Sequence, residues 1–296
     1  MIVQQELNDF INTTKQLIQQ ELQKRLQNLD IPERLKNSML YSIRAGGKRM
    51  RPVLLMASYE AYHHDREKAL SAALALEMIH TYSLIHDDLP AMDDDDLRRG
   101  QPTNHKQYDD ATAVLAGDAL LTFGFEVIAA DAYLTSEEKV QLIQLLSEAS
   151  GPKGMVAGQM LDMEAEKKPV TLAELETIHL NKTGELFRFA IHSGAYLSGA
   201  TAEQLAYLDQ FAHYLGLIFQ VQDDILDVSG DPEKLGKPVG SDNENEKNTY
   251  VRLLGLEGAA SMKQDYVQKA YDALYGANAE TSLLKSLTDY FSNRDH

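Results

Sequence analysis

The sequence contains no cysteine and no tryptophan among its 296 residues. The absence of cysteine excludes a disulfide framework, a thiolate nucleophile and any cysteine-ligated zinc or iron–sulfur site. Basic residues are also scarce, because 28 lysines and arginines stand against 45 aspartates and glutamates, which gives a net charge of −17. This acid excess argues against non-specific binding to nucleic acid or to an anionic membrane surface. We therefore expect neither nucleic acid nor a membrane among the partners.

Motifs for nucleotide binding and for export are missing as well. The sequence has no Walker loop and no G-x-G-x-x-G fingerprint, so the common nucleotide folds are unsupported. The first ten residues lack the basic and apolar regions of a signal peptide. The most apolar stretch, 111–134, carries Asp118, Glu126 and Asp131. We expect a soluble, cytoplasmic protein.

Helical periodicity runs along almost the whole chain. No segment alternates like a strand, and no closely spaced Asn-Gly or Asp-Gly hairpin turn is found. Hydroxyl residues that mark helix starts occur at Thr135, Thr171 and Thr201. The pattern predicts an all-α protein with a single domain over 1–296. The predicted helices cover about 4–28, 33–45, 51–63, 66–89, 111–130, 136–149, 154–166, 171–182, 184–198, 202–228, 246–256, 259–275 and 279–292.

One polar stretch interrupts the helical pattern. Residues 231–248 are rich in glycine, lysine and asparagine. A loop of this length inside a compact domain is usually a lid or a binding loop. We predict a lid over about 231–248.

Two clusters of aspartates lie where carboxylates are unfavourable. The first comprises Asp87, Asp88 and Asp93 to Asp96, and the second comprises Asp223, Asp224 and Asp227. Each begins at the C-terminal end of a long apolar helix, where the helix dipole is already negative. Gln220 and the second cluster follow i, i+3, i+4, i+7 spacing, which predicts one polar stripe. Oxygen ligands without histidine or cysteine suit Mg²⁺ that is shared with substrate phosphates. A solvated acidic surface is the alternative, and for Asp94 to Asp96 alone it is the preferred interpretation.

Cations are grouped close to the first acidic cluster in the sequence. Lys48, Arg49 and Arg51 lie between Gly46-Gly47 and Pro52, and Arg98-Arg99 precedes a turn at Gly100-Gln-Pro102. A glycine pair lets backbone N–H groups approach an anion, while lysine and arginine supply charge and a bidentate fork for phosphate. Further lysines that are weaker candidates, because exposed lysine is common, are Lys182, Lys237 and Lys247.

The helix that ends in the first acidic cluster also predicts a pocket. His80, Ser83 and Asp87 share one helical face, and Tyr82 lies about 7.5 Å before Asp87 along the axis at the helical rise. A bulky aromatic side chain at Tyr82 would form the floor of a pocket whose mouth is the acidic cluster. Ordinary core packing explains Tyr82 equally well, and His80 also fits a core histidine.

Segments 46–52, 85–100 and 220–227 together resemble the trans-isoprenyl diphosphate synthases. The resemblance spans nearly the whole chain, including 154–162, 182–184, 235–237 and Asp242. It implies an all-α fold around a deep central pocket, in which two aspartate-rich motifs and about three Mg²⁺ ions hold an allylic diphosphate. It also implies isoprenoid diphosphates as small-molecule partners and a homodimer.

The resemblance assigns roles to individual residues. The direct metal ligands are Asp87, Asp93 and Asp223, supported by Asp88, Asp227 and Asp242; Asp224 belongs to the same catalytic set. The isopentenyl diphosphate ligands are Lys48, Arg51, His80 and Arg99, and Gly47 is a further substrate-binding residue. The allylic diphosphate ligands are Arg98, Lys182, Lys237 and Lys247. Thr183 and Gln220 line the region where the carbocation forms, and Gln159 and Asp162 lie in the pocket.

The implied reaction is head-to-tail condensation of isopentenyl diphosphate with dimethylallyl and then geranyl diphosphate. Metals and cations neutralise the leaving diphosphate, and closure of the 231–248 loop excludes water from the carbocation. Tyr82 and Ser83 form the chain-length pocket. Tyr82 and the two-residue insertion Pro90-Ala91 resemble the members that make the C15 farnesyl product, and the C20 geranylgeranyl product is the alternative.

Three other classes remain as alternatives. Glu77-Met-Ile-His80 and Glu176-Thr-Ile-His179 are each half of a di-iron carboxylate signature, but that interpretation leaves both aspartate clusters unexplained. His86-Asp87 resembles the metal pair of phosphohydrolases, an interpretation that ignores the second aspartate cluster. A helical scaffold without catalytic activity is the third.

Overall fold

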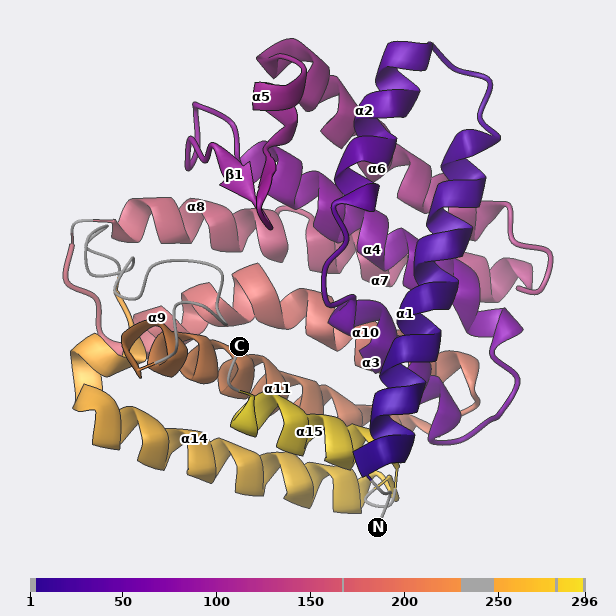
Figure 1. Cartoon of the computed structure of the whole chain (residues 1–296). Coiled ribbons are helices and arrows are strands. Elements are labelled where there is room, and N and C mark those ends of the chain that lie inside the picture. Colours follow the sequence, from indigo (N-terminus) through magenta and orange to yellow (C-terminus); the bar gives the residue numbers. More distant parts are fainter. Residues whose placement is uncertain (1–3, 167, 230–247, 280–281, 295–296) are drawn as a thin grey trace. The chain divides into compact units, whose positions relative to one another are not determined.

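The computed structural model describes residues 4–166, 168–229, 248–279 and 282–294, and helices form most of this part of the chain (Figure 1). The contacts between residues divide the chain into two compact units. The N-terminal unit comprises Asn8–Met56 and Asp65–Ile143. The C-terminal unit comprises Met1–Leu7, Ala57–His64 and Gln144–His296. The prediction of an all-α protein is confirmed, and the single-domain assignment stays a prediction.

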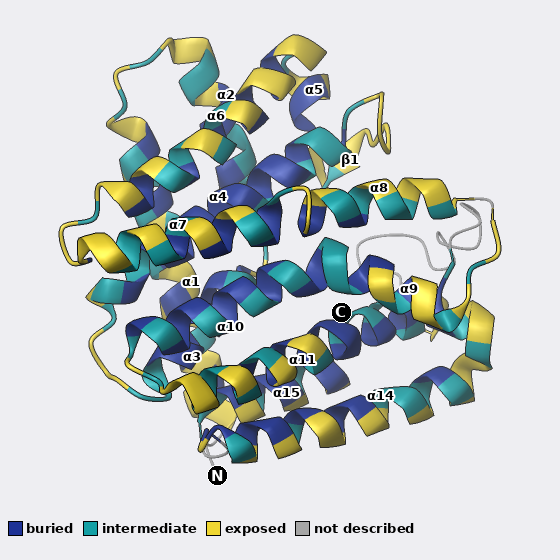
Figure 2. Ribbon diagram, turned by 180° about the vertical axis from the view of Figure 1, so that it is seen from behind, coloured by how far each residue is buried: buried dark blue, intermediate teal, exposed yellow. Residues whose placement is uncertain are grey.

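The helices in the first half of the chain agree closely with the predicted ranges. They are α1 (Gln4–Gln27), α2 (Glu33–Arg44), α3 (Met50–Glu60), α4 (Glu67–Asp87), α5 (Asn104–Gln107), α6 (Asp110–Ala129) and α7 (Ser136–Ser150). The short α5 was not predicted. In the N-terminal unit α4 packs along α6 and contacts α2. Because α4 is apolar on nearly every face, it is mostly buried along its length, as the dark blue ribbon shows (Figure 2).

The prediction that the chain has no strand or hairpin is wrong at one place. Strands β1 (Leu97–Arg98) and β2 (Gln101–Pro102) form a two-residue antiparallel hairpin. Arg99 and Gly100 between them both have positive φ, of 55° and 74°. Two positive φ values match the right-handed twist of a tight hairpin turn, so the turn forms without an Asn-Gly or Asp-Gly pair. The turn therefore lies at Arg99-Gly100, one residue earlier than the turn that was predicted.

The helices of the C-terminal unit also follow the prediction, with two differences. They are α8 (Met155–Ala165), α9 (Leu172–His179), the π-helix η1 (Leu180–Gly184), α10 (Glu185–Leu197), α11 (Ala202–Ser229), α14 (Tyr250–Gly276) and α15 (Leu283–Asn293). The predicted break between 171–182 and 184–198 is absent, because η1 joins α9 to α10. The predicted break near 257 is a kink at Gly255 inside α14, where φ is 72°.

The predicted helix starts at Thr135, Thr171 and Thr201 have the expected capping hydrogen bonds. At Thr171 the hydroxyl accepts a hydrogen bond from the N–H of Glu174, whose side chain accepts one from the N–H of Thr171, and equivalent pairs occur at Thr135 and Thr201. These capping predictions are confirmed.

The predicted lid over 231–248 lies outside the described residues except for Asn248, and so do Lys237, Asp242 and Lys247.

One described helix, α6, is long and apolar enough to cross a membrane by length and composition. Buried residues make up 44% of its most apolar window, and α4 packs along it. A core helix of a globular unit passes the same test, so α6 alone is weak support for a membrane span. The cytoplasmic location stays a prediction.

The π-helix η1 packs closely on α8 at Gly158. A Cβ atom added at Gly158 would lie 2.1 Å from the backbone nitrogen of Lys182. Because this neighbour is backbone rather than a movable side-chain tip, any side chain at Gly158 must push η1 away from α8. Gly158 therefore sets the position of Lys182 and Thr183.

We predict that Gly158→Ala destabilises the chain by about 1–3 kcal/mol, the usual effect of overpacking. Gly124→Ala in α6 is the matched control, because an added Cβ there would meet Ala75 at an ordinary 3.4 Å. Its higher helix propensity should leave stability unchanged or raise it by up to about 1 kcal/mol. Thermal unfolding followed by circular dichroism compares the two variants, and equal midpoints would contradict the assigned packing.

Candidate active site

The Gly46–Arg51 segment of the N-terminal unit forms a cationic loop between α2 and α3. Gly46 and Gly47 have φ values of 78° and 126°, a region that favours glycine. The Arg99 guanidinium donates to the carbonyl oxygen of Gly46, and a Cβ at Gly47 would lie 2.4 Å from its Cζ. Gly47 is thus needed for the close approach of Arg99. The structure brings together Gly47 and Arg99, two of the predicted substrate-binding residues.

Arg51 and His80 also lie next to each other in this unit. The Nη1 atom of Arg51 is 3.2 Å from Nε2 of His80. Burial, followed by the charges of Arg51 and Arg99, holds the pKa of His80 well below its usual range. His80 is therefore neutral, and Nε2 can accept a hydrogen bond from Arg51. Lys48 is exposed on the same loop.

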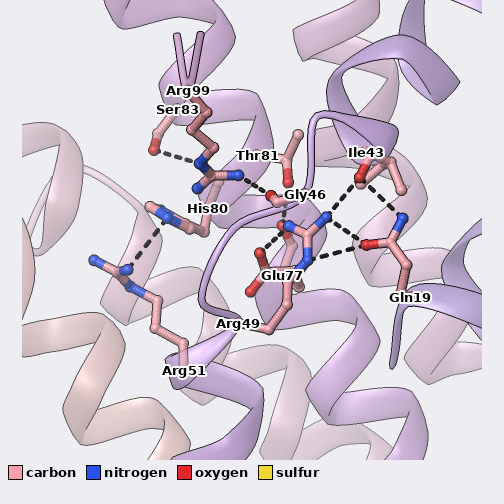
Figure 3. A network of polar contacts seen from close by, with 10 residues as sticks. All are labelled: Gln19, Ile43, Gly46, Arg49, Arg51, Glu77, His80, Thr81, Ser83 and Arg99. Atoms are coloured by element: carbon pink, nitrogen blue, oxygen red, sulfur yellow. Dashed lines mark hydrogen bonds and ion pairs between the residues drawn. The ribbon is translucent and has the colours of Figure 1, made fainter. Parts of the chain in front are cut away.

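Arg49 differs from the other cations of the loop. In the sequence it is one of three neighbouring cations with Lys48 and Arg51, but its side chain turns inward and is only 1% exposed (Figure 3). There it forms an ion pair with Glu77 of α4. Arg49 thus has a different environment from the exposed Lys48.

The first aspartate cluster folds back on the end of α4. The N–H of Asp93 donates to the carbonyl oxygen of Asp87 at 2.9 Å, which places these two predicted metal ligands side by side. Asp88 is only 3% exposed and accepts a 2.6 Å hydrogen bond from Nε of Arg98. Burial raises the pKa of Asp88, and the Arg98 charge opposes this shift. In this structure Asp88 and Arg98 are thus partners of each other.

Asp94 to Asp96 lie at the surface, as the alternative interpretation of the sequence expected. All three are exposed, and Lys106 is 2.8 Å from Asp96 and 3.7 Å from Asp94. Exposed ion pairs of this kind contribute little to stability. This part of the acidic run is a solvated surface.

The C-terminal unit brings four predicted pocket residues into two pairs. Lys182 Nζ on η1 lies 2.6 Å from Oδ2 of Asp162 on α8. The Thr183 hydroxyl donates a 2.9 Å hydrogen bond to Oε1 of Gln220 on α11. π-helical turns often occur at functional sites because the extra residue redirects neighbouring side chains. The contact between Thr183 and Gln220 fits the region expected to face the carbocation, and the predicted allylic diphosphate ligand Lys182 precedes Thr183 on η1. Gln159 lies on α8, as Asp162 does.

The second aspartate cluster is not the uniform polar stripe that the spacing predicted. Asp224 and Asp227 are 6% and 2% exposed, whereas the Asp223 side chain is 42% exposed. The N–H of Tyr250 at the start of α14 donates to Oδ2 of Asp224 at 2.7 Å. The first N–H groups of a helix lack partners within the helix, so Asp224 stabilises the N-terminus of α14. Among the three, Asp223 is the most accessible to a ligand.

Sequence reasoning missed Arg294, which follows α15. Its Nη2 atom forms an ion pair with Asp223, and its guanidinium lies 4.2 Å from the centre of the Phe219 ring. Lys263 and Gln222 hold this end of the chain, since they donate to the carbonyl oxygens of residues 292 and 294, each at 2.8 Å. Arg294 and Asp223 are 71 residues apart in sequence, and no local pattern indicates the pairing.

The Glu-x-x-His pairs do not form a metal site in the described part of the chain. Glu77 is paired with Arg49, and Glu176 accepts a hydrogen bond from the Tyr266 hydroxyl. Within the described ranges no group of three or more histidine, aspartate or glutamate residues is arranged to hold a metal ion by itself. The structure does not support the di-iron interpretation.

The His86-Asp87 interpretation also lacks support. Nε2 of His86 lies 3.1 Å from the carbonyl oxygen of Val114 in α6. A Cβ at Gly117 would lie 2.1 Å from the same nitrogen, so His86 fits closely against α6. This contact gives His86 a packing role between α4 and α6 rather than the role of a metal ligand.

These motifs agree with the comparisons to known proteins. Residues 32–289 match the polyprenyl synthetase family, and the chain belongs to this family. It is 47% identical to the farnesyl diphosphate synthase of Geobacillus stearothermophilus over 100% of both chains, and 47% identical to that of Bacillus subtilis over 98% of this chain and 99% of the relative. The solved structure of an FPP/GFPP synthase from Zymomonas mobilis has 37% identity and a TM-score of 0.84, covering 97% of this chain and 99% of that one. The all-α isoprenoid synthase fold is confirmed.

We predict a pH dependence of stability that arises from His179, which lies one turn before Lys182. Burial lowers the pKa of His179 from 6.5 to about 4. The unfolded chain therefore binds a proton that the folded chain does not, and stability falls as the pH drops through 6.5. From pH 7.5 to pH 5 this group removes about 2 kcal/mol from the free energy of unfolding.

Thermal unfolding at these two pH values measures the effect. His179→Gln should lose less stability on acidification than the unaltered chain does. His64→Gln is the control, because His64 is exposed. An identical pH slope in the unaltered chain and His179→Gln would contradict the assignment of a buried, neutral His179.

Proposed function

We propose that the chain is a farnesyl diphosphate synthase. It condenses isopentenyl diphosphate with dimethylallyl diphosphate and then with geranyl diphosphate to give (2E,6E)-farnesyl diphosphate. The observation that carries this proposal is the full-length similarity to farnesyl diphosphate synthases, with both aspartate motifs and the Gly-Gly-Lys-Arg loop present. A geranylgeranyl diphosphate synthase is the second candidate, since product length depends on few residues.

The residues present fit a divalent metal that enters with substrate. Asp87, Asp93 and Asp223 offer only carboxylate oxygens, and Asp93 and Asp223 are accessible to solvent. Mg²⁺ prefers oxygen ligands and usually completes its coordination with water and phosphate oxygens. This explains why no protein-only cluster of three ligands is needed. We propose about three Mg²⁺ ions per site, the number that the resemblance implies.

The bound metal would neutralise charge on the leaving diphosphate of the allylic substrate. The chain's own cations do the rest of the binding: Lys182 and Arg98 hold the allylic diphosphate, with Lys237 and Lys247 as further ligands by resemblance. The Thr183 hydroxyl and Gln220 amide present fixed dipoles toward the developing allylic cation. The departed diphosphate is the proposed base, so no side chain needs a pKa close to the working pH.

The isopentenyl diphosphate is held by the loop of the N-terminal unit. Lys48 supplies an exposed charge, while Arg51 and Arg99 supply guanidinium forks. Neutral His80 lies beside Arg51 at 3.2 Å and orients it. These groups keep the isopentenyl double bond at a fixed place for attack on the cation.

The product-length proposal depends on Tyr82. Its ring is 6% exposed and meets the His86 ring edge to face at 5.7 Å between centroids. The hydroxyl of Ser83 donates to the carbonyl oxygen of His80 at 2.9 Å, so Ser83 is held against its own helix. Tyr82 is thus a fixed, bulky side chain one turn before the acidic cluster, which suits a floor that stops elongation at fifteen carbons.

We also propose a homodimer in the cytoplasm. The homodimer comes from the resemblance. It is supported by two apolar side chains that α6 leaves exposed, Val114 at 39% and Leu115 at 58%. A second copy that covers them would remove apolar surface from water.

Incubation with isopentenyl and dimethylallyl diphosphates, with and without Mg²⁺, tests the proposed function. We expect farnesyl diphosphate as the main product and no product without metal. Asp87→Ala and Asp223→Ala should each lower turnover by about 100-fold or more at saturating Mg²⁺, because each removes a metal ligand. Asp96→Ala is the control at the solvated end of the same cluster. Near-normal rates of the first two variants would contradict the metal assignment.

Tyr82→Ala tests the product-length assignment separately. Removal of the ring should open the floor and shift the product toward geranylgeranyl diphosphate or longer chains. The product is identified by chromatography after dephosphorylation. An unchanged product distribution would show that Tyr82 is not the floor, while leaving the reaction class intact.

A further inference from the structure

The cationic loop of the N-terminal unit is anchored by a buried ion pair that lies behind it. Arg49 and Glu77 have side chains that are 1% and 2% exposed, and they form an ion pair. Glu77 lies on α4 three residues before His80. Neither residue is among those assigned above to a substrate or a metal.

The Arg49 guanidinium connects three helices (Figure 3). Its Nη1 donates to Glu77 of α4, and its Nη2 donates to the carbonyl oxygen of Ile43 in α2 at 2.6 Å and to Oε1 of Gln19 in α1 at 2.8 Å. The amide nitrogen of Gln19 also donates to the Ile43 carbonyl oxygen, at 3.1 Å. The planar fork of arginine suits such an arrangement, and lysine could not reproduce it.

This anchoring determines how the loop presents its neighbours. Arg49 has a φ of 52°, which a non-glycine residue rarely adopts, and its carbonyl oxygen accepts the N–H of Val53 at the start of α3. With Arg49 turned inward, Lys48 is left exposed and Arg51 lies on the first turn of α3 beside His80. The inward side chain therefore fixes the positions of its cationic neighbours.

The charge of Glu77 balances the cations around it. Its Oε1 binds Arg49, while its buried Oε2 has no hydrogen-bond partner. A buried carboxylate oxygen without a donor is unfavourable unless nearby positive charge compensates for it. Arg49 supplies that charge by direct contact, and Arg99 is close enough to interact with both Arg49 and Glu77. Glu77 in turn offsets the repulsion between these two guanidinium groups before any diphosphate binds.

We propose that Arg49 and Glu77 are positioning residues that shape the isopentenyl diphosphate site without contacting the substrate. The proposal rests on the assignment of Lys48, Arg51, His80 and Arg99 to isopentenyl diphosphate in the proposed function. It predicts that the affinity for isopentenyl diphosphate changes far more than the affinity for the allylic substrate, because the loop that Arg49 anchors carries Lys48 and Arg51. A role in folding alone would instead affect stability and leave the affinity for isopentenyl diphosphate unchanged.

The double variant Arg49→Met/Glu77→Leu separates these two roles. Replacing both members of a buried ion pair with apolar residues is often neutral for stability, whereas removing one member leaves a buried charge unpaired. We expect the thermal midpoint of the double variant to stay within about 5 °C of the unaltered chain. The KM for isopentenyl diphosphate should rise about tenfold, with the KM for geranyl diphosphate and kcat changed less than about twofold.

Equilibrium dialysis with labelled isopentenyl diphosphate alone provides a second readout, and we expect the same tenfold weaker binding. The matched control is Arg188→Met/Glu185→Leu on α10, which removes another Arg–Glu pair, with a 2.7 Å separation. This control should leave both KM values unchanged. Arg49→Lys keeps the buried charge but loses the fork, so it should fold and raise the KM for isopentenyl diphosphate by about threefold.

Three outcomes would overturn the proposal. The first is an unchanged affinity for isopentenyl diphosphate in the double variant and in Arg49→Lys. The second is an equal rise in the KM values for both substrates. The third is the absence of isopentenyl diphosphate binding to the unaltered chain, which would overturn the proposed function as well. If the double variant does not fold, the comparison of Arg49→Lys with the control decides between positioning and folding.

Discussion

Like charges that lie close together in a folded chain need opposite charges within a few ångströms, and the candidate active site depends on this constraint. Each unit meets it with ion pairs of its own. In the N-terminal unit Glu77 lies against Arg49, and Arg98 lies against Asp88. In the C-terminal unit Asp162 holds Lys182, and Arg294 holds Asp223. Arg98, Lys182 and Asp223, to which the proposed function assigns a diphosphate or a metal, are thus already paired.

Two of these pairs lie at opposite extremes of burial. Arg49–Glu77 is removed from water, with both side chains less than 3% exposed, and breaking it would leave a charge without solvation. The side chains of Lys182 and Asp162 are 33% and 39% exposed, and such pairs contribute little to stability. The buried pair holds the backbone in place. In the proposed function, the exposed pair exchanges partners when a diphosphate arrives.

The separation in sequence between interacting residues explains how far the sequence predicts the fold and the site. Helix ranges followed from periodicity and from caps such as Thr171, because both are local properties of the chain. The two aspartate clusters were recognisable from residue type and local spacing, whereas the individual roles of Asp87, Asp93 and Lys182 came from the family resemblance. Arg294 and the inward turn of Arg49 were not recognisable, because each depends on a partner far away in the sequence. The tight hairpin at Arg99-Gly100 was missed because its positive φ values occur without the usual turn residues.

Partner exchange also bears on how a chain with a net charge of −17 can bind an anionic diphosphate. A diphosphate that approached this chain as a bare anion would meet a repulsive field, except at the few cationic groups. With divalent metal bound, the same ligand brings the positive charge that Asp87, Asp93 and Asp223 lack. In the proposed function, Lys182 would then gain phosphate oxygens in place of Asp162, whose side chain is 39% exposed and can be solvated by water. Because this exchange replaces one charge contact with another, it avoids the full cost of desolvating isolated charges.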